Sequence, residues 1–235
     1  ICYYTWMAIG LYALVEIAVS LRDPRTLAPK AVRALSLLVA AGLAFGIAGV
    51  YNLPLKDYAR FSVRGTGGGG GAGMDYATQW SMDLFELPAA FIPSWVGFGG
   101  GTYWGGMPFT DYPNAFVGVI ALLLAVVAFM RGGAASTSAR VFAVVLGLFS
   151  LFVSFGHNFP LYAFLYDHLP MFNRFRVPVM IIILFQLAIA CGAAWGWSAV
   201  LAAGEGKARR DAGLERALLV LAGVLVVIGL VGSGL

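Results

Sequence analysis

The sequence contains little charge. Aspartate, glutamate, lysine and arginine make up 11% of its 235 residues, whereas a soluble domain carries about 25%. Hydrophobic residues make up 60% of the chain, and its mean hydropathy is +0.85. The scarcity of charge excludes an ordinary soluble globular domain, and the composition predicts an integral membrane protein.

Cysteine and histidine are scarce as well, with two residues of each. Cys2 and Cys191 lie in apolar segments without metal-ligand spacing, so buried thiols are favoured over a metal site. His157 and His168 have no partner at metal-ligand spacing, which favours structural or interfacial roles. The sequence therefore predicts no cysteine or histidine metal site and no certain cofactor.

A phosphate-binding loop is also absent. Residues 65–73, GTGGGGGAG, are rich in glycine, but the chain has no GxxxxGK[ST] pattern and the glycines have no strand–turn–helix context. This tract is typical of a flexible linker. The net charge of +4 does not indicate nucleic-acid binding, because the basic residues cluster beside hydrophobic segments, where membrane topology explains them.

Long apolar segments are what the chain has in abundance. A membrane-spanning helix needs about 20 largely apolar residues. Six segments qualify, at roughly 1–21, 32–52, 113–130, 141–156, 177–203 and 217–235. The predicted fold class is therefore all-α, a polytopic transmembrane helix bundle of about six spans. Because the chain opens at Ile1 within an apolar run and stops within another at Leu235, we expect an internal fragment of a longer protein.

The basic residues predict the orientation of these spans. Ten of the fifteen lie in or beside three short linkers, at 22–31, 131–140 and 204–216. The other five lie in two larger loops, 53–112 and 157–176, and are Lys56, Arg60, Arg64, Arg174 and Arg176. By the positive-inside rule the short linkers are cytoplasmic and both larger loops are extracytoplasmic.

This topology divides the chain into three parts. Residues 1–52 form two transmembrane helices with a cytoplasmic linker, and 53–112 form an extracytoplasmic loop with the glycine tract and an aromatic–glycine motif. Residues 113–235 form four transmembrane helices with the extracytoplasmic loop 157–176. Short interfacial helices are expected in both loops.

The predicted spans contain two GxxxG spacings and one carboxylate. GxxxG spacings at Gly42 and Gly46, and at Gly192 and Gly196, allow helices to approach closely. Glu16 is the one ionisable residue well inside a span. It is either a functional carboxylate or a side chain that snorkels to the nearby cytoplasmic end of its helix.

The loop 53–112 contains the first candidate binding residues. From Asp75 onward it is rich in aromatic residues, glycine and carboxylates, which is typical of an ordered functional surface. Asp75 and Gln79 are four residues apart, and Asp83 and Glu86 three apart, so each pair shares a face if the segment is helical. Such faces bind a divalent cation, supply an acid and a base, or carry only solvated charges.

The second half of this loop is apolar and aromatic. Phe91–Trp95 is too short to span a membrane and is interpreted as an interfacial or re-entrant segment. From Gly97 to Gly106, glycines alternate with aromatic residues that include Tyr103 and Trp104. Aromatic rings offer flat faces to sugars or lipids, and the alternative is an aromatic belt on a flexible loop.

The loop 157–176 contains a predicted helix and two arginines. Tyr162, Leu165, Tyr166 and Leu169 follow one another at i, i+3, i+4 and i+7, which predicts an amphipathic helix lying on the membrane. Arg174 and Arg176 then lie on the extracytoplasmic side, against the usual charge bias. They are interpreted as a clamp for an anionic lipid phosphate. The alternative is headgroup anchoring or pairing with Asp167 or a loop carboxylate.

The order of motifs resembles a known family. The chain contains YYTWMAIGLYALVE near its start, then DYATQWSM, FGGGTYWGGMPFTD and SFGHNFPLYAFLYDHLPMFNRFRVP. This arrangement is similar to that of bacterial YfhO-like membrane proteins over nearly the whole chain, most specifically in the two extracytoplasmic loops. Such proteins resemble GT-C glycosyltransferases.

The resemblance implies an enzyme of the bacterial cytoplasmic membrane. It would transfer a sugar from a polyprenyl-phosphate carrier to an envelope glycan or lipid acceptor outside that membrane. The resemblance also implies that the catalytic carboxylate lies before Ile1. Arg174 and Arg176 are then candidates for binding the donor phosphate. Candidates for binding the sugar or the acceptor are Asp75, Gln79, Trp80, Glu86, Tyr103, Trp104 and Asp111. Of these, Asp75, Glu86 and Asp111 are also candidates for binding a divalent cation.

Two alternative functions stay open. A non-catalytic transporter or flippase is expected to place several polar groups within the membrane, whereas only Glu16 stands out here. An envelope-assembly subunit would use the aromatic loop, with Tyr103 and Trp104, as a protein interface.

Overall fold

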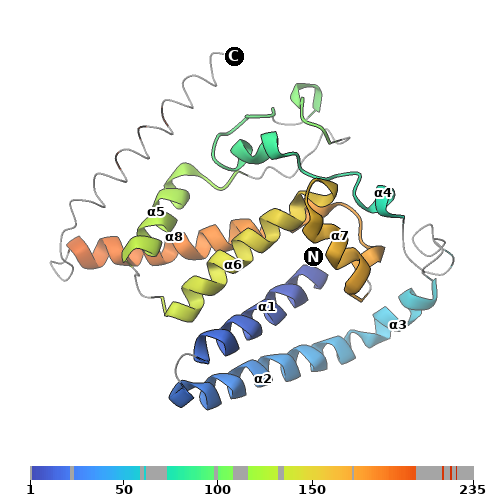
Figure 1. Ribbon diagram of the computed structural model, residues 1–235, viewed down its shortest axis with the longest axis horizontal. Coiled ribbons are helices and arrows are strands. Elements are labelled where there is room, and N and C mark those ends of the chain that lie inside the picture. The colour runs from blue at the N-terminus through green and yellow to red at the C-terminus, as the bar shows by residue number, and fades with distance from the viewer. Residues whose placement is uncertain are drawn as a thin grey trace. The chain divides into compact units, whose positions relative to one another are not determined.

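The computed structural model describes residues 2–21, 24–58, 61, 73–97, 100–107, 116–131, 135–170, 172–204, 219, 223 and 226. Over these residues the chain is all-helical and contains no strand, as the sequence predicts (Figure 1). Its α-helices are α1 (Cys2–Ser20), α2 (Pro24–Ile47), α3 (Gly49–Tyr58), α4 (Met74–Ala77), α5 (Val119–Arg131), α6 (Thr137–Ser154), α7 (Pro160–His168) and α8 (Ile182–Gly204). Its 3-10 helices are η2 (Leu84–Ala90), η3 (Gly100–Thr102), η4 (Gly156–Asn158), η5 (Phe172–Arg174) and η6 (Pro178–Ile181).

Four helical segments are long and apolar enough to cross a membrane. They are Tyr3–Ser20, Ala28–Tyr51, Thr137–Ser154 and Pro178–Ala202. Each coincides, within a few residues, with one of the six segments predicted from hydropathy. The chain is therefore compatible with a multi-pass membrane protein.

The other two predicted spans are not confirmed. The segment 113–130 contains α5, which is apolar but has only 13 residues. A helix of this length rises about 20 Å, against a hydrocarbon core of about 30 Å. The segment 217–235 lies outside the described residues, apart from positions 219, 223 and 226.

The chain forms two compact units, which we describe separately. Unit 1 contains residues 1–82 and 152–181, and unit 2 contains 83–151 and 182–235. This division cuts across the three consecutive parts predicted from the sequence. The predicted loop 53–112 contributes to both units, and its helix α3 continues past residue 52.

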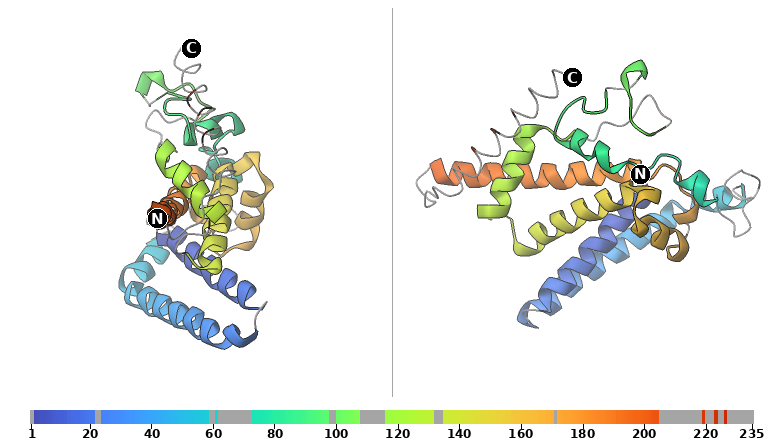
Figure 2. Two further views of the ribbon diagram at one scale, coloured as in Figure 1. Left: turned by 90° about the vertical axis from the view of Figure 1, so that its left-hand side faces the viewer. Right: turned by 45° about the horizontal axis from the view of Figure 1, so that its top comes forward.

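In unit 1, α1 and α2 form an antiparallel hairpin, and they lie side by side in every view (Figures 1 and 2). The ring of Trp6 packs edge-on against that of Phe45, with centroids 5.9 Å apart. Glu16 is buried and pairs with Lys30 of α2 at 3.8 Å, and Tyr12 donates a hydrogen bond to it. The structure thus gives Glu16 partners within the hairpin.

In unit 2, one GxxxG spacing forms a helix contact. A Cβ atom at Gly192 or Gly196 of α8 would collide with Ala125 or with the backbone of Leu124 in α5, so glycine is needed for this approach. The same spacing at Gly42 and Gly46 of α2 makes no such contact, because a Cβ atom at either glycine would meet no atom within 4 Å among the described residues.

The segment 157–176 contains the helix α7. Its Tyr162 is 2% exposed and packs on Phe172 at a centroid distance of 5.2 Å, and Leu165 is also buried. The face predicted to lie on the membrane therefore packs partly against the protein itself. Phe164, on another side of α7, is exposed.

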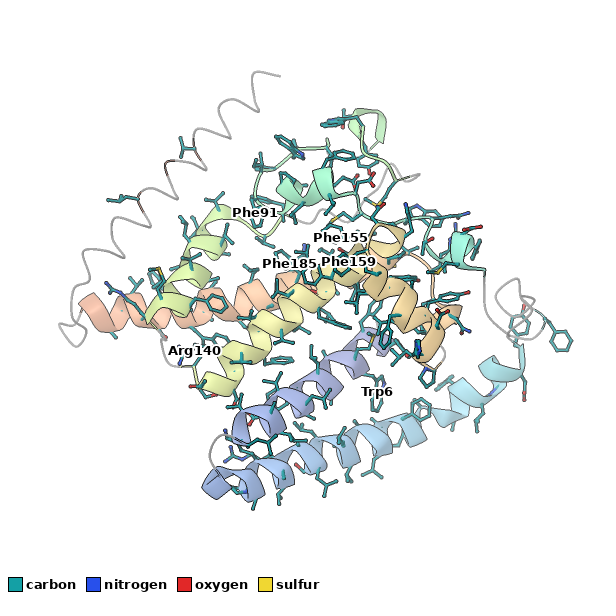
Figure 3. All side chains as sticks on the ribbon, in the orientation of Figure 1. Trp6, Phe91, Arg140, Phe155, Phe159 and Phe185 are labelled. Carbon is teal, nitrogen blue, oxygen red and sulfur yellow. The ribbon has the colours of Figure 1, made fainter. Side chains whose placement is uncertain are left out.

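The helix η2 is fastened to the beginning of α8 in unit 2. Ala90 packs with Ile182 and Phe185, and Phe91 and Val117 extend this apolar cluster. The N–H of Val117 also donates to the carbonyl of Ala90 at 3.1 Å. Phe91 and Phe185 are both labelled in Figure 3.

Candidate functional site

Arg176 is the centre of a polar and aromatic cluster in unit 1. Its guanidinium carbon lies 3.7 Å from the centroid of the Trp80 ring and 4.3 Å from that of Tyr76. Its Nη1 donates to the Tyr76 hydroxyl and its Nη2 to Oε1 of Gln79, each at 2.9 Å. Cation–π contacts and two hydrogen bonds therefore fix the guanidinium in one orientation.

The charge of Arg176 has no counter-ion among the described residues. Both hydrogen bonds go to neutral acceptors, and no described carboxylate forms an ion pair with it. A guanidinium has five N–H donors, so three remain, and one of these, on Nε, is buried and has no acceptor among the described residues. This arrangement suits an anionic ligand at the remaining N–H groups of Nη1 and Nη2.

Backbone hydrogen bonds hold the Trp80 side of the cluster. The N–H of Val179 donates to the carbonyl of Trp80 at 3.4 Å, and that of Met82 to the carbonyl of Ser154 at 2.9 Å. Nδ2 of Asn158 donates to the carbonyl of Met82 at 3.1 Å. The segment carrying Trp80 is thus tied to the end of α6 and to the turn before α8.

Ser81 fits tightly against the loop that follows α6. Its hydroxyl donates to the carbonyl of Thr78 at 2.6 Å and accepts from the N–H of His157 at 3.1 Å. Gly156 has a φ of 53°, and a Cβ atom there would collide with the Ser81 hydroxyl. His157 thus contacts Ser81 through its backbone N–H.

Val177, which follows Arg176, has a φ of 70°. This left-handed conformation is disfavoured for a β-branched residue, and Pro178 restricts the residue before it further. Such strain persists only where surrounding contacts hold it, and it concentrates at functional sites. The turn is held by the hydrogen bond from Met180 N–H to the Val177 carbonyl, at 3.2 Å.

Glu86 is the centre of a second cluster, in unit 2. It is 1% exposed. Its Oε2 accepts from the N–H of Asp83 at 2.9 Å, and its Oε1 accepts from the Tyr103 hydroxyl at 2.5 Å and from the N–H of Gly106 at 3.2 Å. Asp83 and Glu86 also form a reciprocal capping box at the start of η2. The carboxylate is thus occupied by its own chain.

Tyr103 connects this cluster to the glycine-rich loop. Its hydroxyl donates to Glu86 and accepts from the N–H of Met107 at 3.1 Å. Burial, followed by the hydrogen bond to Glu86, raises the pKa of Tyr103 well above its usual value. A Cβ atom at Gly105 would collide with both Glu86 and Tyr103, so the loop closes over the pair only with glycine there.

The remaining predicted residues are placed as follows. Trp104 is exposed and stacks on Phe85 at a centroid distance of 5.8 Å. Asp75 is exposed on α4. Asp111 and the side chain of Arg174 lie outside the described residues. The proposed phosphate clamp is thus represented by Arg176 alone.

The described residues contain no group of three or more histidine, cysteine, aspartate or glutamate side chains placed to hold a metal ion. Asp83 and Glu86, the pair considered for cation binding, instead cap η2. His168 is exposed, and its Nδ1 lies 2.9 Å from the carbonyl of Phe164.

Tyr76 is the functional candidate that sequence reasoning missed. It precedes Trp80 by four residues, the spacing at which side chains on a helix meet. That spacing, together with Arg176, an arginine predicted to lie on the extracytoplasmic side, is the signal that could have indicated Tyr76.

Comparison with known proteins gives no relative. No family model, no curated protein and no solved structure matches the chain.

Proposed function

We propose that the chain belongs to a membrane glycosyltransferase-like protein that binds a polyprenyl-phosphate-linked sugar through Arg176. The observation that carries this proposal is the guanidinium held by Tyr76, Trp80 and Gln79, with no carboxylate counter-ion among the described residues. The phosphate of the donor would supply the missing negative charge. The motif resemblance supplies the reaction class.

The position of Arg176 favours a lipid-borne phosphate. It lies two residues before Pro178, where the apolar segment Pro178–Ala202 begins. In the proposed topology of about six spans, this end faces the extracytoplasmic side of the bacterial cytoplasmic membrane. A phosphate attached to a membrane-embedded polyprenyl chain would be presented at this level.

Binding at Arg176 would also assist transfer. As the sugar leaves, negative charge develops on the carrier phosphate, and a fixed cation stabilises that charge more than it stabilises the ground state. Because the ring contacts already orient the guanidinium, little reorganisation accompanies the step. Arg176 is therefore proposed as a donor-binding and charge-stabilising group.

Arg176→Lys tests the proposal in the whole protein in membranes. Lysine retains the positive charge but loses the planar fork and its stacking. We expect the KM for radiolabelled polyprenyl-phosphate sugar to rise about tenfold, which corresponds to about 1.4 kcal/mol, and kcat to fall further in Arg176→Ala.

The matched control is Arg140→Lys, in α6 (Figure 3). It makes the same change in the first turn of α6, the end of this helix that is predicted to face the cytoplasm. Sugar transfer should therefore be unchanged. Equal transfer by folded Arg176→Ala and wild type would disprove the donor site. Donor binding that depends on Arg176, without transfer to any acceptor, would instead support a flippase or transporter.

A further inference from the structure

The segment from Leu84 to Met107 exposes almost no charge. Glu86 is the single charged residue among its 24 residues, and Glu86 is buried within the Tyr103 network. Surface segments in water normally carry charged side chains. The described surface of this segment is instead formed mostly by apolar, aromatic and glycine residues, and its exposed polar side chains are the uncharged Ser94 and Thr102.

Three large side chains gather on that surface. Leu84 is 65% exposed, Phe85 44% and Trp104 62%. The rings of Phe85 and Trp104 stack with an angle of 20° between their planes. The indole N–H of Trp104 donates no hydrogen bond to the described residues. We call these three residues the Trp104 patch.

The Trp104 patch is held rigidly from beneath. Glu86, one residue after Phe85, accepts a hydrogen bond from Tyr103, one residue before Trp104. The backbone N–H of Trp104 donates to the carbonyl of Val96 at 3.1 Å. Nε1 of Trp95 donates to the carbonyl of Phe85 at 2.7 Å. Both halves of the patch are thus fixed to one network.

The patch also lies close to the end of an apolar helix. Ala90, the last residue of η2, packs on Ile182 and Phe185 in the first turn of α8. A 3-10 helix rises about 2.0 Å per residue, so Leu84 lies within roughly 12 Å of Ala90 along η2. If α8 spans the membrane, this places the patch near the boundary between headgroups and acyl chains.

We infer that the Trp104 patch inserts into the lipid bilayer at this boundary and anchors the outer loop to the membrane surface. Leucine and phenylalanine favour the acyl side, and an indole ring, here with no acceptor for its N–H among the described residues, favours the headgroup level. A protein partner or soluble glycan would more commonly be met by polar groups around the aromatic rings. The absence of exposed charge over the whole segment favours lipid.

Depth-dependent fluorescence quenching tests the inference. The whole protein is reconstituted in phosphatidylcholine vesicles that carry bromine either high or low on the acyl chains. The emission of Trp104 is obtained as the difference between wild type and Trp104→Phe, which retains an apolar ring. We expect bromine near the headgroup to remove most of this emission, bromine near the chain ends to remove less, and aqueous iodide to remove little.

Trp197→Phe provides the matched control, because Trp197 is exposed on α8 and its emission should also respond to brominated lipid. The inference would be overturned if iodide quenches the emission of Trp104 and neither brominated lipid does, while brominated lipid still quenches the emission of Trp197. The result does not depend on sugar transfer, so it stands apart from the proposed function.

Discussion

Arg176 and Glu86 are the charged centres of the two polar clusters, and the chain surrounds them differently. Both oxygens of Glu86 accept hydrogen bonds, from one hydroxyl and two backbone N–H groups, and the side chain is buried. Arg176 is half-buried and uses two of its five N–H groups on described residues. The Glu86 carboxylate thus uses most of its acceptor sites within its own fold, whereas the Arg176 guanidinium is oriented by the fold but keeps most of its donors.

This difference separates a structural charge from a binding charge. A buried carboxylate whose two oxygens both accept hydrogen bonds stabilises the segment that supplies the donors, and removing it leaves those donors unsatisfied. A cation that is fixed by aromatic rings and neutral acceptors keeps its net charge for a ligand. We therefore expect mutations at Glu86 to affect stability, and mutations around Arg176 to affect binding.

Glu86→Ala should produce the largest effect. It leaves the Tyr103 hydroxyl and the N–H groups of Asp83 and Gly106 without their acceptor, at a cost on the order of 3–5 kcal/mol in the free energy of unfolding. Denaturant titration in mixed micelles measures the total, and hydrogen exchange over Asp83–Met107 measures the local change. Arg176→Ala should lower the free energy of unfolding by less.

Glu86→Gln is the control for this experiment. Glutamine has nearly the same shape and keeps one acceptor oxygen. Its NH2 group, however, replaces the other oxygen and would face a hydrogen-bond donor there. Its loss of stability should lie between wild type and Glu86→Ala. If hydrogen exchange over Asp83–Met107 is unchanged in Glu86→Ala, the hydrogen bonds to Glu86 do not hold this segment in place.

Gly105→Ala should have the next largest effect. The added Cβ collides with Glu86 and Tyr103, and overpacking of this kind costs about 1–3 kcal/mol. Gly101→Ala makes the same chemical change at a position with no atom within 4 Å among the described residues, so it should be nearly neutral. Equal thermal unfolding of both variants would contradict the close packing of the loop around Glu86.

The spans and the clusters differ in how far the sequence could predict them. Span prediction uses the hydropathy of consecutive residues, and four of the six predicted spans have matching helices. The partners of Arg176 are 97 and 100 residues away along the chain, so no local pattern pairs them. The sequence indicated Arg176, Gln79 and Trp80 as candidates, but not that they form one cluster.

The GxxxG spacings show the same limit. Gly192 and Gly196 meet α5 closely, whereas Gly42 and Gly46 have no neighbour within 4 Å in the described part of the chain. The spacing shows only that a helix face is narrow enough for close approach. Which helix covers that face is decided by tertiary structure. For Asp83 and Glu86, too, the three-residue spacing fitted a cation site, an acid–base pair or solvated charges, whereas in the structure the two residues cap η2 and Glu86 is buried.

Tyr76→Phe should have the smallest effect on stability and is the sharpest test of the Arg176 side of the comparison. It removes the hydroxyl that accepts from Nη1 but keeps the ring beneath the guanidinium, so the free energy of unfolding should fall by about 0.5–1.5 kcal/mol. Tyr51→Phe is the control, because it removes a hydroxyl from an exposed tyrosine and measures how much this change alone alters the free energy of unfolding. Donor KM should rise less than in Arg176→Lys, because the charge and the stacking both remain. A stability loss as large as that of Glu86→Ala would show that Arg176, like Glu86, serves the fold, and the contrast between the two charges would then disappear.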